Sequence, residues 1–220
     1  MLEKILKSVV CLSVAILAAG CAAPVKQLDY TAFKQSRPKT ILILPPLNES
    51  PDVKATYGML AQMSYPLAEA GYYVLPVALV DETLKQNGMT AAADSHAIAP
   101  AKLQEIFGAD AALYVTISKY GSVYTVLNSA VVVTANAKLM DLKSGALLWS
   151  GTASASSAEG SNNGGGGLIG ALVAAAVNQI VNNVTDRGFT IAGLTSQRLL
   201  SAQQPNGILY GPYSPKYGTD

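Results

Sequence analysis

The sequence contains little charge, one histidine and two cysteines, and each scarcity excludes a class of function. Charged residues make up 13% of the 220 residues, whereas hydrophobic residues make up 50%. This excludes an intrinsically disordered chain, which would be polar and rich in charge. The 15 basic and 14 acidic residues nearly cancel, so the chain lacks the positive excess that nucleic-acid binding requires. With so few His and Cys, most metal sites and nucleophile–base pairs are excluded as well.

The N-terminal segment has the pattern of a secretory signal. Lys4 and Lys7 give a basic start, an apolar stretch covers residues 8–19, and small residues lead to Cys21. A basic region, a short apolar region and small residues before a cleavage site are the parts of a signal peptide. The apolar stretch is too short for a membrane span, which needs roughly 20 residues. We therefore predict a signal peptide over residues 1–20.

The end of this signal, Leu17-Ala18-Ala19-Gly20-Cys21, resembles a bacterial lipobox. The resemblance implies that Cys21 carries a diacylglycerol, becomes the first residue of the mature chain and is acylated at its new amine. Cys11 would be removed with the signal, so no disulfide could form within the mature chain. Ala22 follows Cys21, where an Asp commonly means retention at the inner membrane. The implied location is the outer membrane, lipid-anchored and facing the periplasm, with surface exposure left open.

The remainder of the chain is predicted to form one α/β domain. Residues 22–38 show no clear period, so residues 21–38 are interpreted as a lipidated tether. Residues 39–202 alternate between apolar β-branched runs and helical patterns, which predicts a mixed β-sheet with helices packed on it. Residues 203–220 contain three Pro, three Gly and three Tyr, and are predicted to form an extended surface tail.

Periodicity and turn residues place the individual elements. The strands are expected at residues 40–44, 72–76, 111–120, 124–142 and 146–155. The helices are expected at residues 51–70, 77–87, 100–107, 168–186 and 189–202. Pro66 predicts a kink or break in the first helix near Tyr65, and residues 89–99 are expected to form a loop. The last two strands are joined by a tight turn at residues 143–145, so they must be antiparallel neighbours.

No group of residues predicts a cofactor, a metal or a catalytic set. The glycines at 164–167 precede an apolar helix, but they lack the Lys of a phosphate-binding loop. His96 stands beside Asp94 and Ser95, yet three consecutive residues cannot take up the geometry of a hydrolase triad. His96 is therefore interpreted as a solvated loop residue.

Three groups keep two interpretations each. The carboxylate pairs Glu49/Asp52 and Asp81/Glu82 could in principle serve a glycan-cleaving enzyme, although helix starts and helix faces often carry such acids. The apolar helix at 168–186 is either a core helix or a partner-binding helix. The tyrosines suit a protein interface or a glycan-binding surface, and those of the tail also suit a disordered end; they are Tyr57, Tyr65, Tyr72, Tyr73, Tyr210, Tyr213 and Tyr217.

Several stretches together resemble one protein family. Leu44–Val53 resembles its opening motif, and Tyr65–Val77 resembles its central motif. Leu142–Gly145 with Leu148-Trp149, and the Gly-rich loop before Leu168, also agree. The family consists of bacterial lipoproteins of unknown function and is typified by a neisserial surface antigen studied as a vaccine candidate. Its members look like the N-terminal domain of TolB and the periplasmic domains of CsgG and LpoB.

This resemblance implies a TolB N-terminal or CsgG-like fold without a cofactor. It implies a non-enzymatic accessory or structural component of a CsgG-like envelope or secretion assembly, anchored in the membrane by its lipid. The implied partner is a CsgG-like lipoprotein or another envelope protein, and a homo-oligomer is an alternative. An LpoB-like regulator of a peptidoglycan synthase is the second hypothesis, and an envelope-glycan enzyme is the third. Only Cys21 transfers from the family as a functional position.

Overall fold

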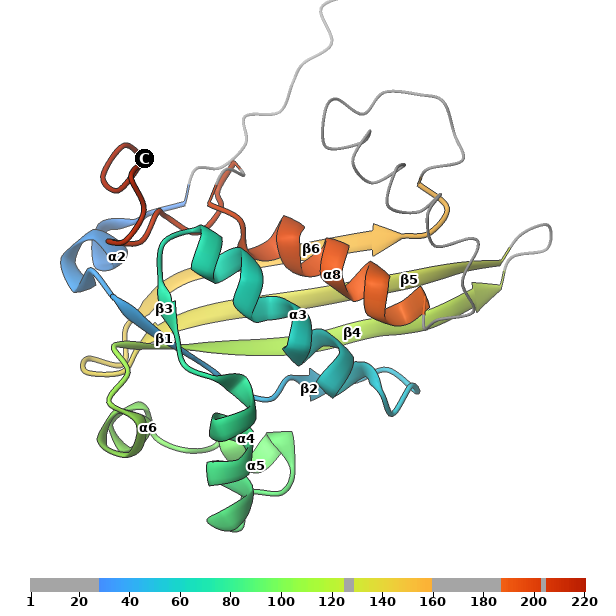
Figure 1. The fold of residues 1–220 in the computed structure, drawn as a ribbon, viewed down its shortest axis with the longest axis horizontal. Helices are drawn as coiled ribbons and strands as arrows, with labels where there is room; N and C mark the ends of the chain where they lie inside the picture. The colour runs from blue at the N-terminus through green and yellow to red at the C-terminus, as the bar shows by residue number, and fades with distance from the viewer. Residues whose placement is uncertain (1–27, 125–128, 160–186, 203–204) are drawn as a thin grey trace, which may run out of the picture.

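A mixed six-stranded sheet organises the residues that the structure describes. The computed structural model describes residues 28–124, 129–159, 187–202 and 205–220 (Figure 1). The signal sequence with Cys21 lies outside these residues, as do the glycines at 164–167 and the helix expected at 168–186. Their predicted roles therefore stay predictions.

The strands form a sheet with a parallel half and an antiparallel half. Their order is β3-β1-β4-β5-β6, and the short β2 pairs separately with β4. β3 and β1 are parallel, β1 and β2 both run parallel to β4, and β4, β5 and β6 are antiparallel to one another in turn. The predicted mixed sheet is thus confirmed. The strands are β1 (Thr40–Ile43), β2 (Leu47–Asn48), β3 (Tyr73–Val74), β4 (Ala111–Tyr124), β5 (Ser129–Asp141) and β6 (Leu147–Ser156).

Two longer helices, α3 (Ala55–Glu69) and α8 (Arg187–Leu200), lie along one face of the sheet (Figure 1). Their apolar side chains pack against alternate residues of every long strand, because successive strand residues point to opposite faces. The resulting core includes Met59, Met63 and Leu67 of α3, Ile191 and Leu199 of α8, and Leu113, Val115, Ile117, Val133 and Leu139 of the sheet.

Among the described residues, helices cover the opposite face at the β1 end. Three short helices lie there: α4 (Val77–Gln86), α5 (Ala92–His96) and α6 (Pro100–Phe107). A second, smaller core joins Leu42, Leu44, Ala112 and Leu142 to Val80 and Leu84 of α4 and Leu103 of α6. Beyond that core, the antiparallel strands present alternate side chains that are half-buried or exposed.

Some element boundaries differ from the sequence-based expectation. α3 begins at Ala55 rather than Pro51, because the Asp52 carboxylate accepts the Lys54 N–H in a turn before the helix. The helix continues through Pro66 to Glu69, so the expected break near Tyr65 does not occur. Pro66 lies in the last turns of the helix, where the missing N–H removes a single helical bond.

The N-terminal segment is packed on the domain, which shortens the expected tether. Residues 31–36 form the helix α2 (Thr31–Ser36), and Phe33 is 4% exposed. The Ser36 hydroxyl donates to the Asp141 carboxylate at the turn between β5 and β6. Phe33 anchors this segment because leaving so large an apolar side chain in water would cost about 1.5–3 kcal/mol.

The C-terminal segment forms no helix or strand among its described residues, yet it is not a loose surface tail. Ile208 is 1% exposed. Three buried or half-buried aromatic side chains donate hydrogen bonds to carbonyl oxygens of this segment. The three bonds are Trp149 Nε1 to Asn206 O (2.9 Å), Tyr30 Oη to Gly207 O (2.6 Å) and Tyr72 Oη to Leu209 O (2.6 Å). The expectation of an exposed tail is therefore wrong for residues 206–211.

Gly71 is the point at which this segment meets the end of α3. Gly71 adopts φ +93°, a conformation that favours glycine, and its carbonyl accepts the Tyr213 N–H at 3.0 Å. A Cβ at this position would overlap the backbone of Ser214. Gly88, which follows α4, has a similar φ of +85°, but open space surrounds it.

We expect Gly71→Ala to destabilise the protein by about 3 kcal/mol and Gly88→Ala by about 1 kcal/mol. Both changes place a Cβ in the left-handed region, which costs roughly 1–2 kcal/mol. Only the change at Gly71 must also displace the C-terminal segment. Urea unfolding, followed by the fluorescence of the single Trp149, measures both costs. Equal losses in the two variants would show that the segment does not pack on Gly71.

Candidate functional site

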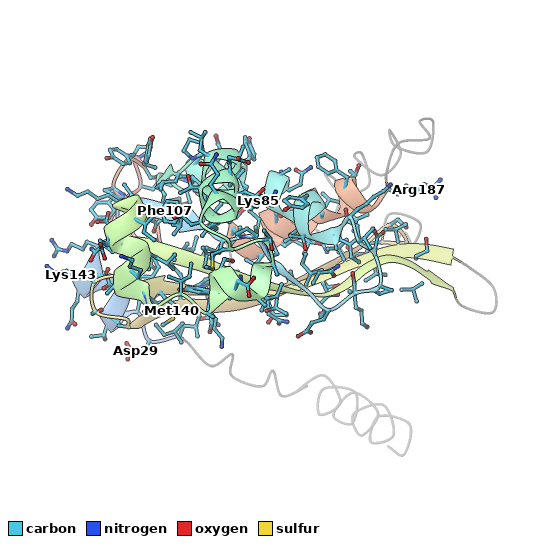
Figure 2. The ribbon with its side chains drawn as sticks, turned by 90° about the horizontal axis from the view of Figure 1, so that it is seen from below. Asp29, Lys85, Phe107, Met140, Lys143 and Arg187 are labelled. Atoms are coloured by element: carbon cyan, nitrogen blue, oxygen red, sulfur yellow. The ribbon has the colours of Figure 1, made fainter. Side chains whose placement is uncertain are left out.

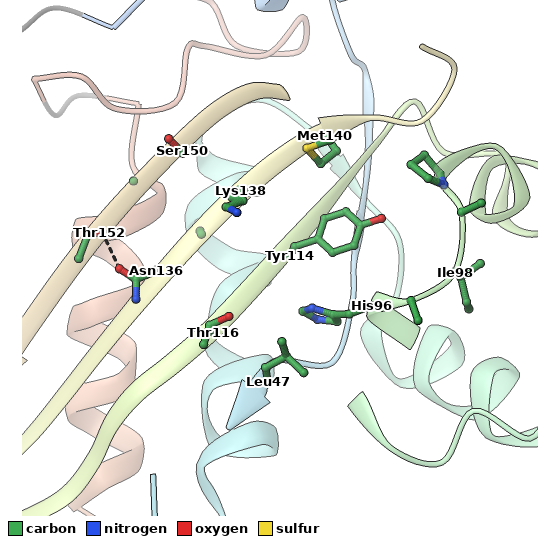
Figure 3. Close-up of a pocket in the computed structure, with 15 residues that line it drawn as sticks. Leu47, His96, Ile98, Tyr114, Thr116, Asn136, Lys138, Met140, Ser150 and Thr152 are labelled. Atoms are coloured by element: carbon green, nitrogen blue, oxygen red, sulfur yellow. Dashed lines mark hydrogen bonds between the residues drawn. The ribbon is translucent and has the colours of Figure 1, made fainter. Parts of the chain in front are cut away.

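A hollow on the uncovered half of the sheet is the candidate site. It lies between the faces of β4, β5 and β6 and the segment that joins α5 to α6 (Figure 3). Its volume is about 880 Å³, toward the upper end of the roughly 300–1,000 Å³ of small-molecule sites. Polar side chains from the three strands form its floor, and residues 96–100 form its wall.

Strand register arranges the floor into two rows. Thr116 pairs with Asn136, which pairs with Thr152 in the next strand. Two residues further along, the second row consists of Tyr114, Lys138 and Ser150. Strands lie about 4.8 Å apart and rise about 3.4 Å per residue, so each row spans about 10 Å and the rows are about 7 Å apart.

The floor is polar because it is the solvent side of a half-buried sheet. In β5, Ala135, Ala137 and Leu139 point toward the α3–α8 core, and the intervening Asn136 and Lys138 point away from it. This alternation is the usual pattern of an antiparallel sheet with one solvated face. The same alternation continues in β6.

His96 of the wall packs against Tyr114 of the floor. The imidazole of His96 lies edge-on to the Tyr114 ring, with 5.3 Å between the ring centroids. Its Nε2 is 3.0 Å from the Pro45 carbonyl oxygen. Since a carbonyl oxygen only accepts, Nε2 carries the hydrogen, and Nδ1 is an acceptor in the neutral ring.

The structure corrects the interpretation of His96 as a solvated loop residue. The expected loop contains α5, and His96 is the last residue of that helix and half-buried. Burial lowers the pKa of His96, and the hydrogen bond to Pro45 only partly opposes this effect. Asp94 accepts the Ala91 N–H and Ser95 donates to the Ala92 carbonyl, so neither of them orients His96.

The hollow favours negatively charged or neutral ligands. Lys138 is the one permanently charged residue among its described lining, which includes no Asp or Glu. The Thr152 hydroxyl donates to Asn136 Oδ1 at 2.7 Å (Figure 3). That bond turns the Asn136 amide so that Nδ2 remains a donor, while the Thr152 oxygen remains an acceptor.

The predicted carboxylates lie elsewhere. Asp81 forms an ion pair with Lys85 (2.7 Å), and Glu82 accepts a hydrogen bond from Gln86 (2.9 Å), both within α4. Glu49 and Asp52 flank the turn before α3, and none of the four acids lines the hollow. In the part of the chain that the structure describes, no three His, Cys, Asp or Glu side chains gather so as to hold a metal ion.

A second surface, which we call the tyrosine edge, lies where α3, β3, α4 and the C-terminal segment meet. β3 is the outermost strand on this side of the sheet. Each side chain of this surface is about half or more exposed: Tyr57 48%, Tyr65 61%, Tyr73 56%, Leu79 66% and Tyr213 67%. Tyr57 lies against Lys85 of α4, with the ammonium 5.0 Å from the ring centroid.

Five of the seven tyrosines identified in the sequence thus separate into two groups. Tyr72 is buried, and burial raises its pKa, so it serves the packing of the C-terminal segment. Tyr57, Tyr65, Tyr73 and Tyr213 remain exposed on the tyrosine edge. Exposed clusters of large apolar side chains mark interaction surfaces more often than chance.

Sequence reasoning missed the hollow. The alternation of β5 and β6 was a usable signal, because Asn136, Lys138, Ser150 and Thr152 occupy alternate positions. The sequence pattern does not give the strand register that aligns these four residues. It also does not give the path of the segment that contains α5. In Figure 2, Met140 of the lining lies toward the end of the molecule that carries Lys143, and Arg187 marks the opposite end.

None of the helices in the described residues combines the length and the apolar character needed to cross a bilayer.

Comparison with known proteins gives consistent matches. The sequence pattern of a family described as "Putative lipoprotein GNA1162-like" matches residues 28–213. The lipoprotein NMB1124/NMB1162 of Neisseria meningitidis serogroup B is 54% identical over 200 residues, which cover 91% of this chain and 92% of that protein.

One solved structure of the family shows the same fold. The crystal structure of lipoprotein GNA1162 from Neisseria meningitidis matches with a TM-score of 0.54 and 58% sequence identity. The match covers 66% of this chain and 100% of that chain. The C-terminal domain of LpoB from Salmonella enterica matches with a TM-score of 0.40 and 18% identity, covering 53% of this chain and 82% of that chain. A likeness at that level carries no argument about function.

We expect the C2 proton of His96 to titrate with a midpoint below 6.5 in proton NMR of the full-length protein in micelles. The unfolded chain would then take up the proton first as the pH falls through about 6.5. Stability supplied by the neutral, buried ring is therefore present above that pH and is lost as the pH falls toward the folded pKa.

Because His96 is the single histidine, the assignment needs no second experiment. His96→Gln keeps a hydrogen-bond donor for Pro45 but cannot titrate. We expect this variant to lose less stability between pH 6.5 and pH 5.5 than the parent protein does. A midpoint at or above 6.5 would contradict the burial of the ring.

Proposed function

Because the chain belongs to the GNA1162-like family of lipoproteins, we propose that it is a non-enzymatic, lipid-anchored protein of the outer membrane that binds other envelope proteins. The exposed tyrosine edge is the observation that carries the binding role. The lipobox resemblance of residues 17–21 supports the anchor.

The proposed anchor is Cys21. Without Lys4, Lys7 and Glu3 the mature chain has 13 basic and 13 acidic residues, so attraction to anionic lipid would contribute little. A single acyl chain binds membranes only marginally, whereas two or three hold a protein firmly. Six residues lie between Cys21 and Leu28, where the described chain begins, so the two can be at most about 25 Å apart. The end of the domain that carries α2 would therefore stay near the membrane.

The tyrosine edge suits contact with another protein. Aromatic residues are enriched at protein interfaces, and Tyr combines apolar area with a polar tip. The neighbouring β3 is only two residues long, so the sheet edge offers little for uncontrolled strand pairing. The surface can thus bind through side chains without presenting a long free strand.

The local contacts of the candidate acidic side chains favour a non-enzymatic role. The best candidates for acid–base work, Asp81 and Glu82, are engaged with cationic or amide side chains on the surface of α4. Asp52 is engaged in the turn before α3. An envelope-glycan enzyme accordingly remains the weakest of the three hypotheses.

The candidate partners come from the sequence resemblance. That resemblance implies a CsgG-like lipoprotein in an envelope or secretion assembly, a peptidoglycan synthase in the LpoB-like alternative, or a second copy of this chain. Each partner would be recognised by the same exposed surface, so one crosslinking experiment distinguishes them.

We expect Cys21→Ala to release the protein from the outer-membrane fraction into the soluble fraction, because the acyl chains are the proposed anchor. The measurement is density fractionation of cells that express the parent or the variant, with metabolic labelling by an alkyne fatty acid. Cys11→Ala is the matched control and should leave both labelling and fractionation unchanged. A labelled, membrane-bound Cys21→Ala protein would refute the anchor.

We expect a photo-crosslinking residue at Tyr65 or Tyr213 to capture a discrete envelope protein in intact cells. The same residue at Glu105, an exposed position on α6 away from the tyrosine edge, is the control. Mass spectrometry of the adduct identifies the CsgG-like protein, the synthase or a second copy. No adduct at Tyr65 and Tyr213, or equal adducts at Glu105, would remove the support for this surface.

A further inference from the structure

The hollow on the sheet has the lining of a ligand site, which the proposed protein contacts do not explain. The tyrosine edge lies at the β3 side of the sheet, whereas the hollow lies over β4, β5 and β6. The two surfaces can therefore act independently. We propose that the hollow binds a saccharide that carries a carboxylate, with Lys138 pairing the carboxylate.

The mixture of side chains in the hollow suits a sugar. A sugar ring has apolar C–H faces and a rim of hydroxyls that both donate and accept hydrogen bonds. The hollow supplies the same mixture, because the Tyr114 ring and Leu47 and Met140 adjoin the polar rows of Thr116 and Asn136. Small-molecule sites combine apolar walls with a few fixed polar groups in this way.

The hydrogen-bond donors and acceptors on the floor of the hollow are arranged to suit the hydroxyls of a sugar. The bond from the Thr152 hydroxyl to Asn136 Oδ1 fixes both side chains, so the Asn136 amide N–H groups and the Thr152 oxygen are oriented in advance. Thr134 and Ser154 repeat this bridge one step along the strands, with 2.8 Å between their hydroxyl oxygens. Hydroxyl partners are thus available along an elongated ligand, as an oligosaccharide requires.

The charge of the lining favours a ligand with a carboxylate. Within the described residues, Lys138 has no ion-pair partner, and the lining includes no carboxylate to oppose an anion. A phosphate site would usually offer a helix N-terminus, a nest of backbone N–H groups or several cations. One ammonium group among hydroxyls and an amide matches a single carboxylate better.

Two sources of such a saccharide exist in a bacterial envelope, and they differ in the position of the carboxylate. In peptidoglycan the lactyl carboxyl of muramic acid is amide-linked, so the free carboxylates belong to the short peptide attached to the sugar. In acidic polysaccharides the carboxylates occur on uronic acid rings. The shared chemistry is a sugar that carries a carboxylate on its ring or on an attached peptide, and the probes separate the two sources.

The test is isothermal titration calorimetry of the full-length protein in micelles with three probes. These are a disaccharide muropeptide, trigalacturonate, and the neutral chitotriose. We expect at least one acidic probe to bind about fivefold to tenfold more tightly than chitotriose, because a charge-assisted hydrogen bond adds to the hydroxyl contacts. Binding of the muropeptide alone identifies peptidoglycan as the source, and binding of trigalacturonate alone identifies an acidic polysaccharide.

Two variants locate the binding. Lys138→Gln should weaken the binding of the acidic probe about fivefold to tenfold and leave the affinity for chitotriose unchanged. Lys143→Gln removes the same charge from a turn outside the hollow and should leave every affinity unchanged. Failure of all probes, or an equal effect of the two variants, would overturn the proposal. So would a discrete protein adduct from a photo-crosslinking residue at Thr116 if no probe binds.

Discussion

The burial of one face of three long antiparallel strands is the constraint on which the rest of the structure depends. β4, β5 and β6 contain 14, 13 and 10 residues, and their alternate apolar side chains require cover along their length. α3 and α8 supply this cover on one face only. Among the described residues, the helices between β3 and β4 are too short to do the same on the other face, so part of that face is uncovered. The hollow is a direct consequence of this difference in length.

A second consequence concerns the two ends of the described chain. Neither end joins the sheet, yet both are fixed by side chains that the domain core holds in place. Tyr30, Tyr72 and Trp149 each donate a hydrogen bond to a carbonyl oxygen between residues 206 and 209. Buried backbone carbonyls need such partners when no helix or strand supplies them. The C-terminal segment in turn shapes the tyrosine edge, because Tyr213 is held against Gly71.

The family and the fold therefore leave two surfaces with different chemistry. The tyrosine edge is aromatic, exposed and located at the β3 side of the sheet. The hollow is concave, is lined by both polar and apolar side chains and carries the single ammonium group of Lys138. Under the two proposals, the anchored protein would hold an envelope protein on one side and a carbohydrate on the other. Asp52, Asp81 and Glu82 are each engaged in local contacts, which agrees with a role in binding.

The sequence by itself determined the signal and lipobox pattern, the mixed sheet and most helices, because each depends on neighbouring residues or on a short period. Strand Thr40–Ile43, helix Pro100–Phe107 and the turn at Gly145 are examples. Tertiary structure decided the surroundings of His96, the packing of residues 206–211 and the alignment of Asn136, Lys138 and Thr152. These features join residues far apart in the chain through register and side-chain packing, and a local pattern carries no information about such partners.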